Sequence, residues 1–211
     1  LVARDRYDAS DYLSNSIELA RFEGSLYGIP YANMHNVLGY RRDLLDRFGV
    51  GVPESMEELV DAALTVQSRL RAAGDETTYG FVSRGRGGHG FNVWILASTF
   101  FPAWGGYWFD ERGRPAVTSE ACVQALETYV QLMREAGPPH ASALLWTEAH
   151  DFFEAGGAAF FIDAATELTL MRGVRREHEL CGQRVTLFAL PDGEQPAAPF
   201  ALRLFSLRGR Q

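Results

Sequence analysis

The sequence predicts an α/β fold over residues 38–190, with helices on both faces of a mixed sheet. Two long segments, 56–73 and 119–136, carry apolar residues at helical spacing. Two short apolar runs, 78–82 and 158–163, have the length and composition of strands. Because strands alternate with helices along the chain, we expect a layered architecture.

The first expected elements are two helices. Residues 41–48 form a short helix that Gly49 ends as a C-cap glycine. In the next helix, Ser55 and Glu58 have the spacing of a capping box, and Gly74 marks the end. The expected buried face of this helix holds Met56, Leu59, Val60, Ala63 and Leu70.

A strand, a loop, a helix and a hairpin are expected next. The strand 78–82 leads into GRGGHG at 85–90, whose glycines predict a flexible loop. Residues 91–101 favour a helix that ends before the following proline. Residues 107–117 (YWFDERGRPAV) predict a hairpin with its turn around 111–113.

Two more helices complete the pattern. Thr118 and Ser119 are expected to cap a helix that ends at Gly137. Its predicted apolar face holds Ala121, Cys122, Ala125, Leu126, Tyr129, Leu132 and Met133. Thr147 is expected to cap a shorter helix that ends at Gly156. Strands are expected at 158–163 and 185–191.

Composition indicates a soluble globular protein. Of 211 residues, 46% are hydrophobic and 22% are charged, which is ordinary for a folded domain and excludes a disordered chain. The net charge of −7 argues against nucleic acid as a partner, since phosphates require clustered cations. All 20 basic side chains are Arg, which we attribute to genomic composition.

The ends of the sequence and its cysteines add three expectations. No apolar run is long enough to span a bilayer, and the first residues lack a signal-peptide pattern. Because the chain starts abruptly without Met, we expect a fragment or a processed product. Cys122 and Cys181 are more consistent with two buried thiols than with one disulfide, which stays open.

Candidate binding residues follow the strand ends, where open α/β sheets bind ligands. Arg84 follows the strand 78–82, and Asp163 ends the strand 158–163. Each also has a purely structural interpretation: Arg84 pairs with a surface carboxylate, and Asp163 caps a following helix.

Two further pairs complete the candidate set. Asn33 and His35 share one face of an extended stretch whose side chains alternate. Trp94 and Trp108 supply aromatic faces on which sugar C–H groups stack, while Arg, Asp and Asn supply directional hydrogen bonds. For Trp94 a core position is as consistent with the sequence as a stacking role, and for His35, beside an apolar run, a core position is the more common one. The combination favours a polyhydroxylated solute.

Catalytic, metal and nucleotide sites lack support. The five His are scattered, and the sequence contains neither a zinc-binding pattern nor a G-x-S-x-G elbow. The loop RGRGGHG lacks the Lys-Ser/Thr of a P-loop and the spacing of a dinucleotide fingerprint. We therefore expect no enzyme, no cofactor and no metal, although two glycosidase carboxylates need not lie close in sequence.

In order and spacing, the motifs resemble the family 1 extracellular solute-binding proteins, the sugar receptors of ABC importers. The matching segments include GSLYGIPY, LGYRRDLLDRFGVGVPESMEEL, YGFVSRGRGG, GGYWFDERGRPAVTSEACVQALETYVQLMREAGPP, WTEAHDFFEAGGAAFFIDA and FALPDGEQPA. RGRGG and AAFFIDA resemble the branch associated with sugars and sugar alcohols.

The resemblance implies a lobe like those of type II periplasmic binding proteins, in a chain about half as long as family members. Residues 1–31 correspond to the end of an N-terminal lobe, and 32–37 to a hinge strand. Residues 38–190 correspond to the C-terminal lobe, and 191–211 to a second hinge and a return strand. No cofactor is implied.

The resemblance also implies a mechanism and partners. Asn33, His35 and Arg84 contact the solute, Trp94 and Trp108 stack on it, and Asp163 accepts its hydroxyls. The solute stabilises a closed state, which docks on the transmembrane subunits of an ABC permease. The protein is periplasmic or extracellular, and it meets the membrane only through the permease or a lipid anchor.

The chain alone is expected to bind solute weakly or not at all, because part of the site is absent. Its hinge segments 24–37 and 196–211 present unpaired edges, so self-association is expected. Two other functions stay open: a carbohydrate-active enzyme domain, which would turn over a glycoside, and a solute-sensing module, which gene neighbourhood would distinguish.

Overall fold

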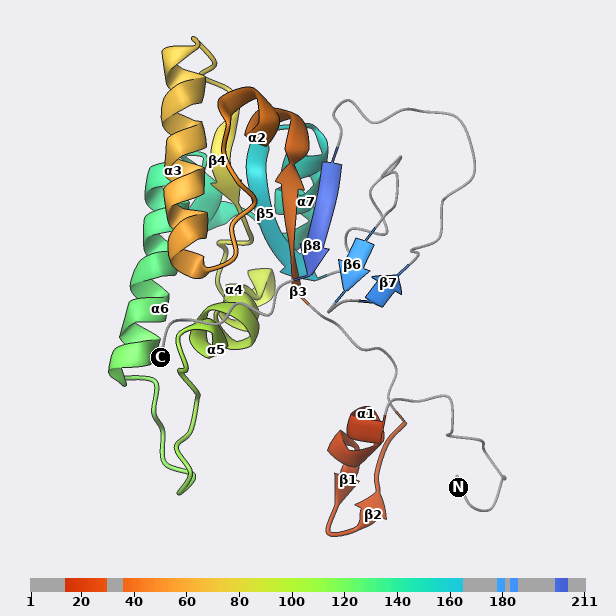
Figure 1. Cartoon of the computed structure of the whole chain (residues 1–211). Coiled ribbons are helices and arrows are strands. Elements are labelled where there is room, and N and C mark those ends of the chain that lie inside the picture. Colours follow the sequence, from red (N-terminus) through yellow and green to blue (C-terminus); the bar gives the residue numbers. More distant parts are fainter. Residues whose placement is uncertain (1–13, 30–35, 165–177, 181–182, 186–199, 205–211) are drawn as a thin grey trace. The chain divides into compact units, whose positions relative to one another are not determined.

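The structure is a computed structural model that describes residues 14–29, 36–164, 178–180, 183–185 and 200–204 (Figure 1). The chain divides into two compact units, Leu1–His35 and Asn36–Gln211. The first unit contains α1 (Ser14–Leu19) and a small antiparallel pair, β1 (Arg21–Phe22) and β2 (Ser25–Leu26).

The second unit is built on a four-stranded sheet with the order β4-β5-β3-β8 (Figure 1). Its strands are β3 (Asn36–Arg41), β4 (Tyr79–Val82), β5 (Ala158–Ala164) and β8 (Phe200–Leu204). β4 and β5 are parallel, whereas β3 is antiparallel to both β5 and β8. The predicted mixed sheet is therefore confirmed. A separate hairpin joins β6 (His178–Leu180) to β7 (Gln183–Val185).

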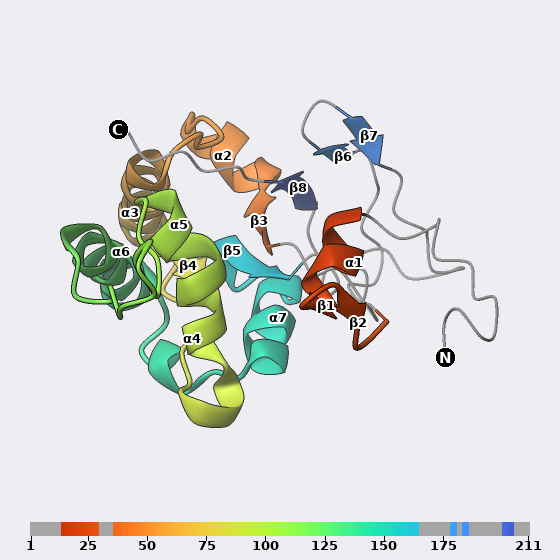
Figure 2. The ribbon, with the colours of Figure 1, turned by 90° about the horizontal axis from the view of Figure 1, so that it is seen from below.

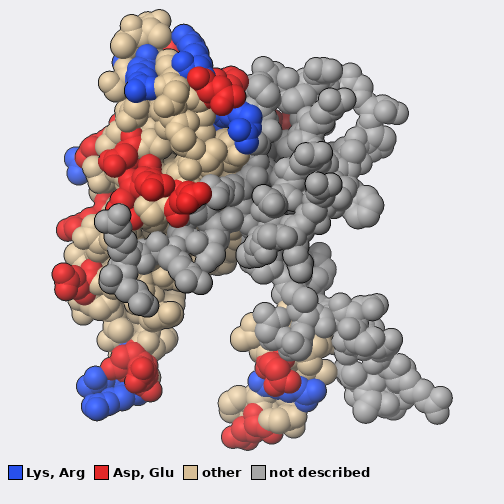
Figure 3. All heavy atoms as spheres, in the orientation of Figure 1, with Lys and Arg blue, Asp and Glu red and all other residues tan. Residues whose placement is uncertain are grey.

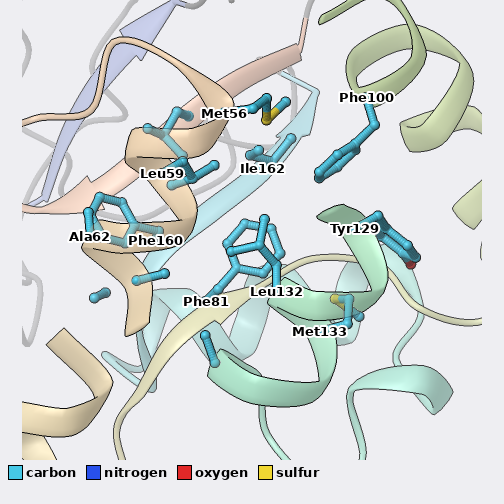
Figure 4. Packing of buried hydrophobic residues seen from close by; sticks show 14 of the residues in the cluster. Met56, Leu59, Ala62, Phe81, Phe100, Tyr129, Leu132, Met133, Phe160 and Ile162 are labelled. Atoms are coloured by element: carbon cyan, nitrogen blue, oxygen red, sulfur yellow. The ribbon is translucent and has the colours of Figure 1, made fainter. Parts of the chain in front are cut away.

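Helices cover both faces of the sheet, as predicted (Figure 2). On one face lie α2 (Arg42–Phe48), α3 (Met56–Ala72) and α6 (Glu120–Gln131). On the other face, α7 (Trp146–Glu154) packs against a smaller apolar cluster around Phe153 and Phe161. Figure 4 shows the larger cluster, in which Phe81 and Phe160 of the sheet meet Leu59 of α3 and Leu132.

Local capping explains where three of these helices begin and end. Gly49 ends α2 in a left-handed conformation, with φ of 60°. The Ser55 hydroxyl accepts from the Glu58 N–H at 3.2 Å, but the Glu58 carboxylate accepts from the Glu54 N–H rather than from Ser55. Ser119 caps α6 by accepting from the Cys122 N–H at 3.4 Å. The predicted capping box at Ser55 is therefore present in half, and its return hydrogen bond is made to the preceding residue.

The cap of α7 differs from the prediction. The helix begins at Trp146, so Thr147 lies inside its first turn. Glu148 takes the capping role instead, because its carboxylate accepts from the Leu145 N–H at 2.8 Å. A glutamate three residues into a helix satisfies an N–H that no helical carbonyl can reach.

The expected helix 91–101 is interrupted and longer than predicted. It consists of α4 (Asn92–Ile95), a π-helical turn at Leu96–Phe100 and α5 (Phe101–Ala103). Pro102 is accommodated because the hydrogen-bond ladder restarts at Phe101, so its missing N–H falls in a first turn that needs no donor. A second π turn, Leu132–Ala136, ends α6.

Other connections complete the unit. The glycine-rich loop contains one 3₁₀ turn at Gly88–Gly90, and another lies at Ala141–Ala143. The predicted hairpin is present as a single antiparallel bridge between Phe109 and Pro115, with Gly113 at φ of 72°.

Leu126 was placed on the buried face of α6, but it is 45% exposed, because this face is narrower than its apolar residues suggest. Cys122 is buried and unpaired, and Cys181 lies outside the described residues. Of the predicted strand 185–191, only Val185 is described, at the end of β7. No helix in the described ranges has the length and hydropathy of a membrane span.

Candidate functional site

The candidate site lies where the parallel strands β4 and β5 end, beside the first residue of β3. The register pairs Val82 with Phe161, so the side chains two residues further along each strand, Arg84 and Asp163, become neighbours. Parallel strands deliver their carboxyl ends to one edge of a sheet, which is where ligands bind in open α/β folds. This topology brings together two residues that the sequence places at separate strand ends.

Arg84 and Asp163 form a buried bidentate ion pair. The Arg84 Nε donates to Asp163 Oδ2 at 2.8 Å, and Nη2 donates to Oδ1. The Ala164 N–H also donates to Oδ1, at 2.6 Å. The side chains are 8% and 0% exposed. Both carboxylate oxygens are therefore occupied within the protein.

Burial controls the electrostatics of this pair. Loss of water raises the pKa of the Asp163 carboxyl, and the hydrogen bonds and charge of Arg84 lower it only in part. His150, on α7, adds a smaller lowering effect. The guanidinium is thus the group that keeps an otherwise unfavourable carboxylate charged in the interior.

Trp94 joins this pair through its ring. The Arg84 Cζ atom lies over the indole, 4.9 Å from the ring centroid, within the range of a cation–π contact. Trp94 is half-buried and belongs to α4. Asp163 fixes Arg84, and Arg84 in turn fixes the orientation of the indole, so three of the predicted residues come together.

The backbone after β4 is held in place by three partners. The Tyr129 hydroxyl donates to the Arg84 carbonyl at 2.8 Å, and the Asn92 amide donates to the Gly85 carbonyl at 3.3 Å. The Gly85 N–H donates to the Leu144 carbonyl at 3.1 Å. Burial raises the pKa of Tyr129 to about 12, so its hydroxyl keeps its proton and remains a donor.

Trp108 makes its ring contact with another residue. Trp108 is 41% exposed and packs edge-on against Phe101, with ring centroids 5.3 Å apart. Among the described residues, it makes no ring contact or hydrogen bond with Arg84, Trp94 or Asp163. Asn33 and His35 lie outside the described residues.

Sequence reasoning missed a polar cluster next to Trp94. The Asn36 side chain, at the start of β3, donates to the hydroxyls of Ser98 and Thr99 in the π turn. Asn36 was overlooked because, in an extended segment, it points to the opposite face from Asn33 and His35, and only their face was considered. The three hydroxyl and amide groups come from segments 62 and 63 residues apart, which no local pattern reveals.

One cluster in the described ranges has the residue types of a metal site. His150, Asp151 and Glu154 on α7 offer ligand atoms within 4.8 Å of one another, and His150 Nδ1 lies 3.1 Å from Asp151 Oδ1. Asp151 is exposed, and two of the three residues are consecutive. This arrangement is common on helix surfaces and supports no metal assignment.

The charged surface in view is mixed. On the face shown in Figure 3, the described Arg side chains lie among Asp and Glu side chains and form no continuous basic area.

Comparison with known proteins identifies a family and a curated relative. Residues 2–173 match the family model described as bacterial extracellular solute-binding protein. The mannitol-binding protein of Pseudomonas aeruginosa is 32% identical over 161 residues. The alignment covers 75% of this chain and 36% of that protein.

Two solved structures share the fold. A solute-binding protein from Agrobacterium vitis with bound D-mannitol has a TM-score of 0.72 at 24% identity, covering 96% of this chain and 43% of that one. A solute-binding protein from Agrobacterium radiobacter in complex with ribitol has a TM-score of 0.63 at 28% identity, covering 80% and 41%. The chain thus spans well under half the length of each of these relatives.

Proposed function

The chain belongs to the bacterial extracellular solute-binding protein family, and we propose that it binds a sugar or sugar alcohol for an ABC importer. The family consists of transport receptors, which confirms the expectation that the chain is not an enzyme.

The observation that carries this proposal is the fixed indole of Trp94. Its ring is held by Arg84 from within the protein, at the sheet edge where solutes bind. A rigid aromatic face suits the C–H groups of a polyol and gains binding energy at little cost in side-chain entropy.

Arg84 and Asp163 are assigned a positioning role in place of direct contact with the solute. Because Asp163 is inaccessible and its oxygens are occupied, we assign Asp163 and Arg84 to positioning Trp94 rather than to accepting hydroxyls. Asn33, His35 and Trp108 remain proposed solute contacts.

A linear sugar alcohol is our preferred solute. The mannitol-binding relative and the two structures holding D-mannitol and ribitol all concern acyclic polyols. The division of the chain between His35 and Asn36 falls inside the proposed hinge strand 32–37, and so supports that domain assignment. We further propose docking on a membrane permease in the periplasm or at the cell surface, with or without a lipid anchor.

Self-association through the hinge segments is proposed in a narrower form. Along Phe200–Leu204, β8 pairs with β3, so that side of the strand is not free to pair with another copy. The other edge of β8 takes part in no described strand pairing, but β6 lies near this strand, so pairing with another copy there would compete with that neighbour.

Saturation-transfer NMR with D-mannitol and ribitol tests the function, since it detects weak binding. Replacing Trp94 by Ala should weaken alditol binding about 2- to 13-fold, the loss expected for one aromatic contact. Trp146→Ala, which alters a half-buried indole at the start of α7, should leave binding unchanged. Equal binding by both variants would remove Trp94 from the site, and hydrolysis of an oligosaccharide would contradict the assignment to a transport receptor.

A further inference from the structure

The amide of Asn36 is held between two hydroxyls. Its Nδ2 donates to Ser98 Oγ at 2.7 Å and also to Thr99 Oγ1. Asn36 begins β3, whereas Ser98 and Thr99 belong to the π turn Leu96–Phe100. The cluster therefore joins the sheet to the helix that carries Trp94.

The hydrogen bonds fix which end of the amide faces the helix. The Ser98 hydroxyl already donates to the Trp94 carbonyl at 2.5 Å, so its oxygen can only accept from Asn36. The NH₂ group must therefore point toward Ser98, and Oδ1 must point away from it. An amide whose orientation is usually ambiguous is determined here by its neighbours.

Two hydrogen-bonding positions are left open by this arrangement. Asn36 Oδ1 is buried and accepts from no described residue. Thr99 Oγ1 accepts from Asn36, and its proton is not donated to any described residue. A buried acceptor without a donor is costly, and native structures retain such groups mainly where water or a ligand supplies the donor.

A hydroxyl group is the complement of this pair, since it donates and accepts at once. We propose that Asn36 Oδ1 and Thr99 Oγ1 together bind a hydroxyl of the sugar alcohol, with Oδ1 accepting its proton and Thr99 donating to its oxygen. This inference rests on the proposed function and extends it.

The position of the cluster agrees with this role. Ser98 is exposed, so solvent reaches the edge of the cluster. Ser98 is one helical turn from Trp94 and donates to its carbonyl, so the cluster adjoins the helical segment that carries the indole. Asn36 and Thr99 then determine specificity by requiring a hydroxyl where the carbon chain passes them.

The test uses the whole chain, ribitol and D-mannitol, and a set of their mono-deoxy analogues. Thr99→Val keeps the shape of the side chain and removes its hydroxyl, and Asn36→Ala removes the acceptor. Each should weaken binding of the parent alditol about 5- to 150-fold, because a hydroxyl is left partly unpaired. Thr118→Val, at an exposed position before α6, is the matched control and should bind normally.

The deoxy analogues separate direct contact from a structural effect. One analogue lacks the hydroxyl that Thr99 binds, and wild type should bind this analogue as weakly as the Thr99→Val variant binds the parent alditol. The Thr99→Val variant should bind this analogue and the parent alditol equally. Thr99→Val keeps the test valid if Asn36→Ala does not fold. If the chain binds alditols and neither substitution changes its affinity, this inference is wrong, and a trapped water is the partner of Asn36. A chain that binds no alditol overturns the proposed function as well.

Discussion

Replacement of Arg84 by Met tests whether the buried ion pair organises the site. The substitution removes two hydrogen bonds and the positive charge from an Asp163 carboxylate that is 0% exposed. Breaking a buried pair on one side costs about 3–5 kcal/mol. For a chain of this length, that loss lowers the melting temperature by roughly 6–20 °C.

The pH dependence of this loss has a defined sign. Burial already raises the pKa of Asp163 in the native state, and removing the guanidinium raises it further. A carboxyl whose pKa is higher in the folded than in the unfolded state favours folding when protonated, and this advantage is lost as pH rises through the folded pKa. The deficit of the variant should therefore shrink as pH is lowered through the pKa of Asp163 in the folded variant.

Thermal unfolding of three variants measures these effects. Arg84→Met should be strongly destabilised, and Arg84→Met with Asp163→Leu should recover most of the loss, because a buried apolar pair needs no counter-charge. Arg114→Met is the control, since its partner Asp110 lies at the exposed hairpin and no measurable change is expected. Equal stability of the single and double variants, at every pH, would refute the coupling of Arg84 to Asp163.

Three further predictions concern the fold, and all are read from melting curves. In Gly80→Ala the new methyl would lie 2.9 Å from the Ala63 carbonyl carbon and closer still to its oxygen, so we expect the stability to fall by about 1–3 kcal/mol. Gly51→Ala, with open space around it, should not destabilise the protein. Equal melting temperatures of the two variants would contradict this packing. Leu132→Ala, at a fully buried position, should lower the free energy of unfolding by about 2–5 kcal/mol. Leu126→Ala, at an exposed position, should change it by less than about 0.5 kcal/mol. The reverse order would place Leu126 on the buried face of α6, as the sequence predicts. Ser55→Ala should cost about 1 kcal/mol through loss of the α3 cap, unlike Ser68→Ala on the exposed side of that helix.

The sequence was sufficient where a signal is local. Gly49, Ser55 and Ser119 mark helix ends by their own conformation or side chain, and the structure places them there. The position of Arg84 beside Asp163 was also accessible, because it follows from two parallel strands that end together.

The failures have one physical origin, the competition between local preference and tertiary packing. Pro102 was expected to end a helix, yet a restarted hydrogen-bond ladder accommodates it. Leu126 has the spacing of a core residue, but it lies on a side of α6 that stays exposed after the helix has packed against its neighbours. Asn36 and Thr99 meet across 63 residues, and neither carries a sequence signal of its own.

The π turn at Leu96–Phe100 has a consequence for how such a site changes during evolution. A π turn holds one residue more than an α-helical turn, so it arises by inserting a residue into a helix rather than by substituting one. Deleting one residue within 96–100 would restore regular winding and rotate everything beyond by about 100°. The Trp94 side of the helix would stay in place, while Thr99 would turn away from Asn36. With the role proposed for Asn36 and Thr99, gain or loss of a single codon would then change solute preference without any change to the aromatic face.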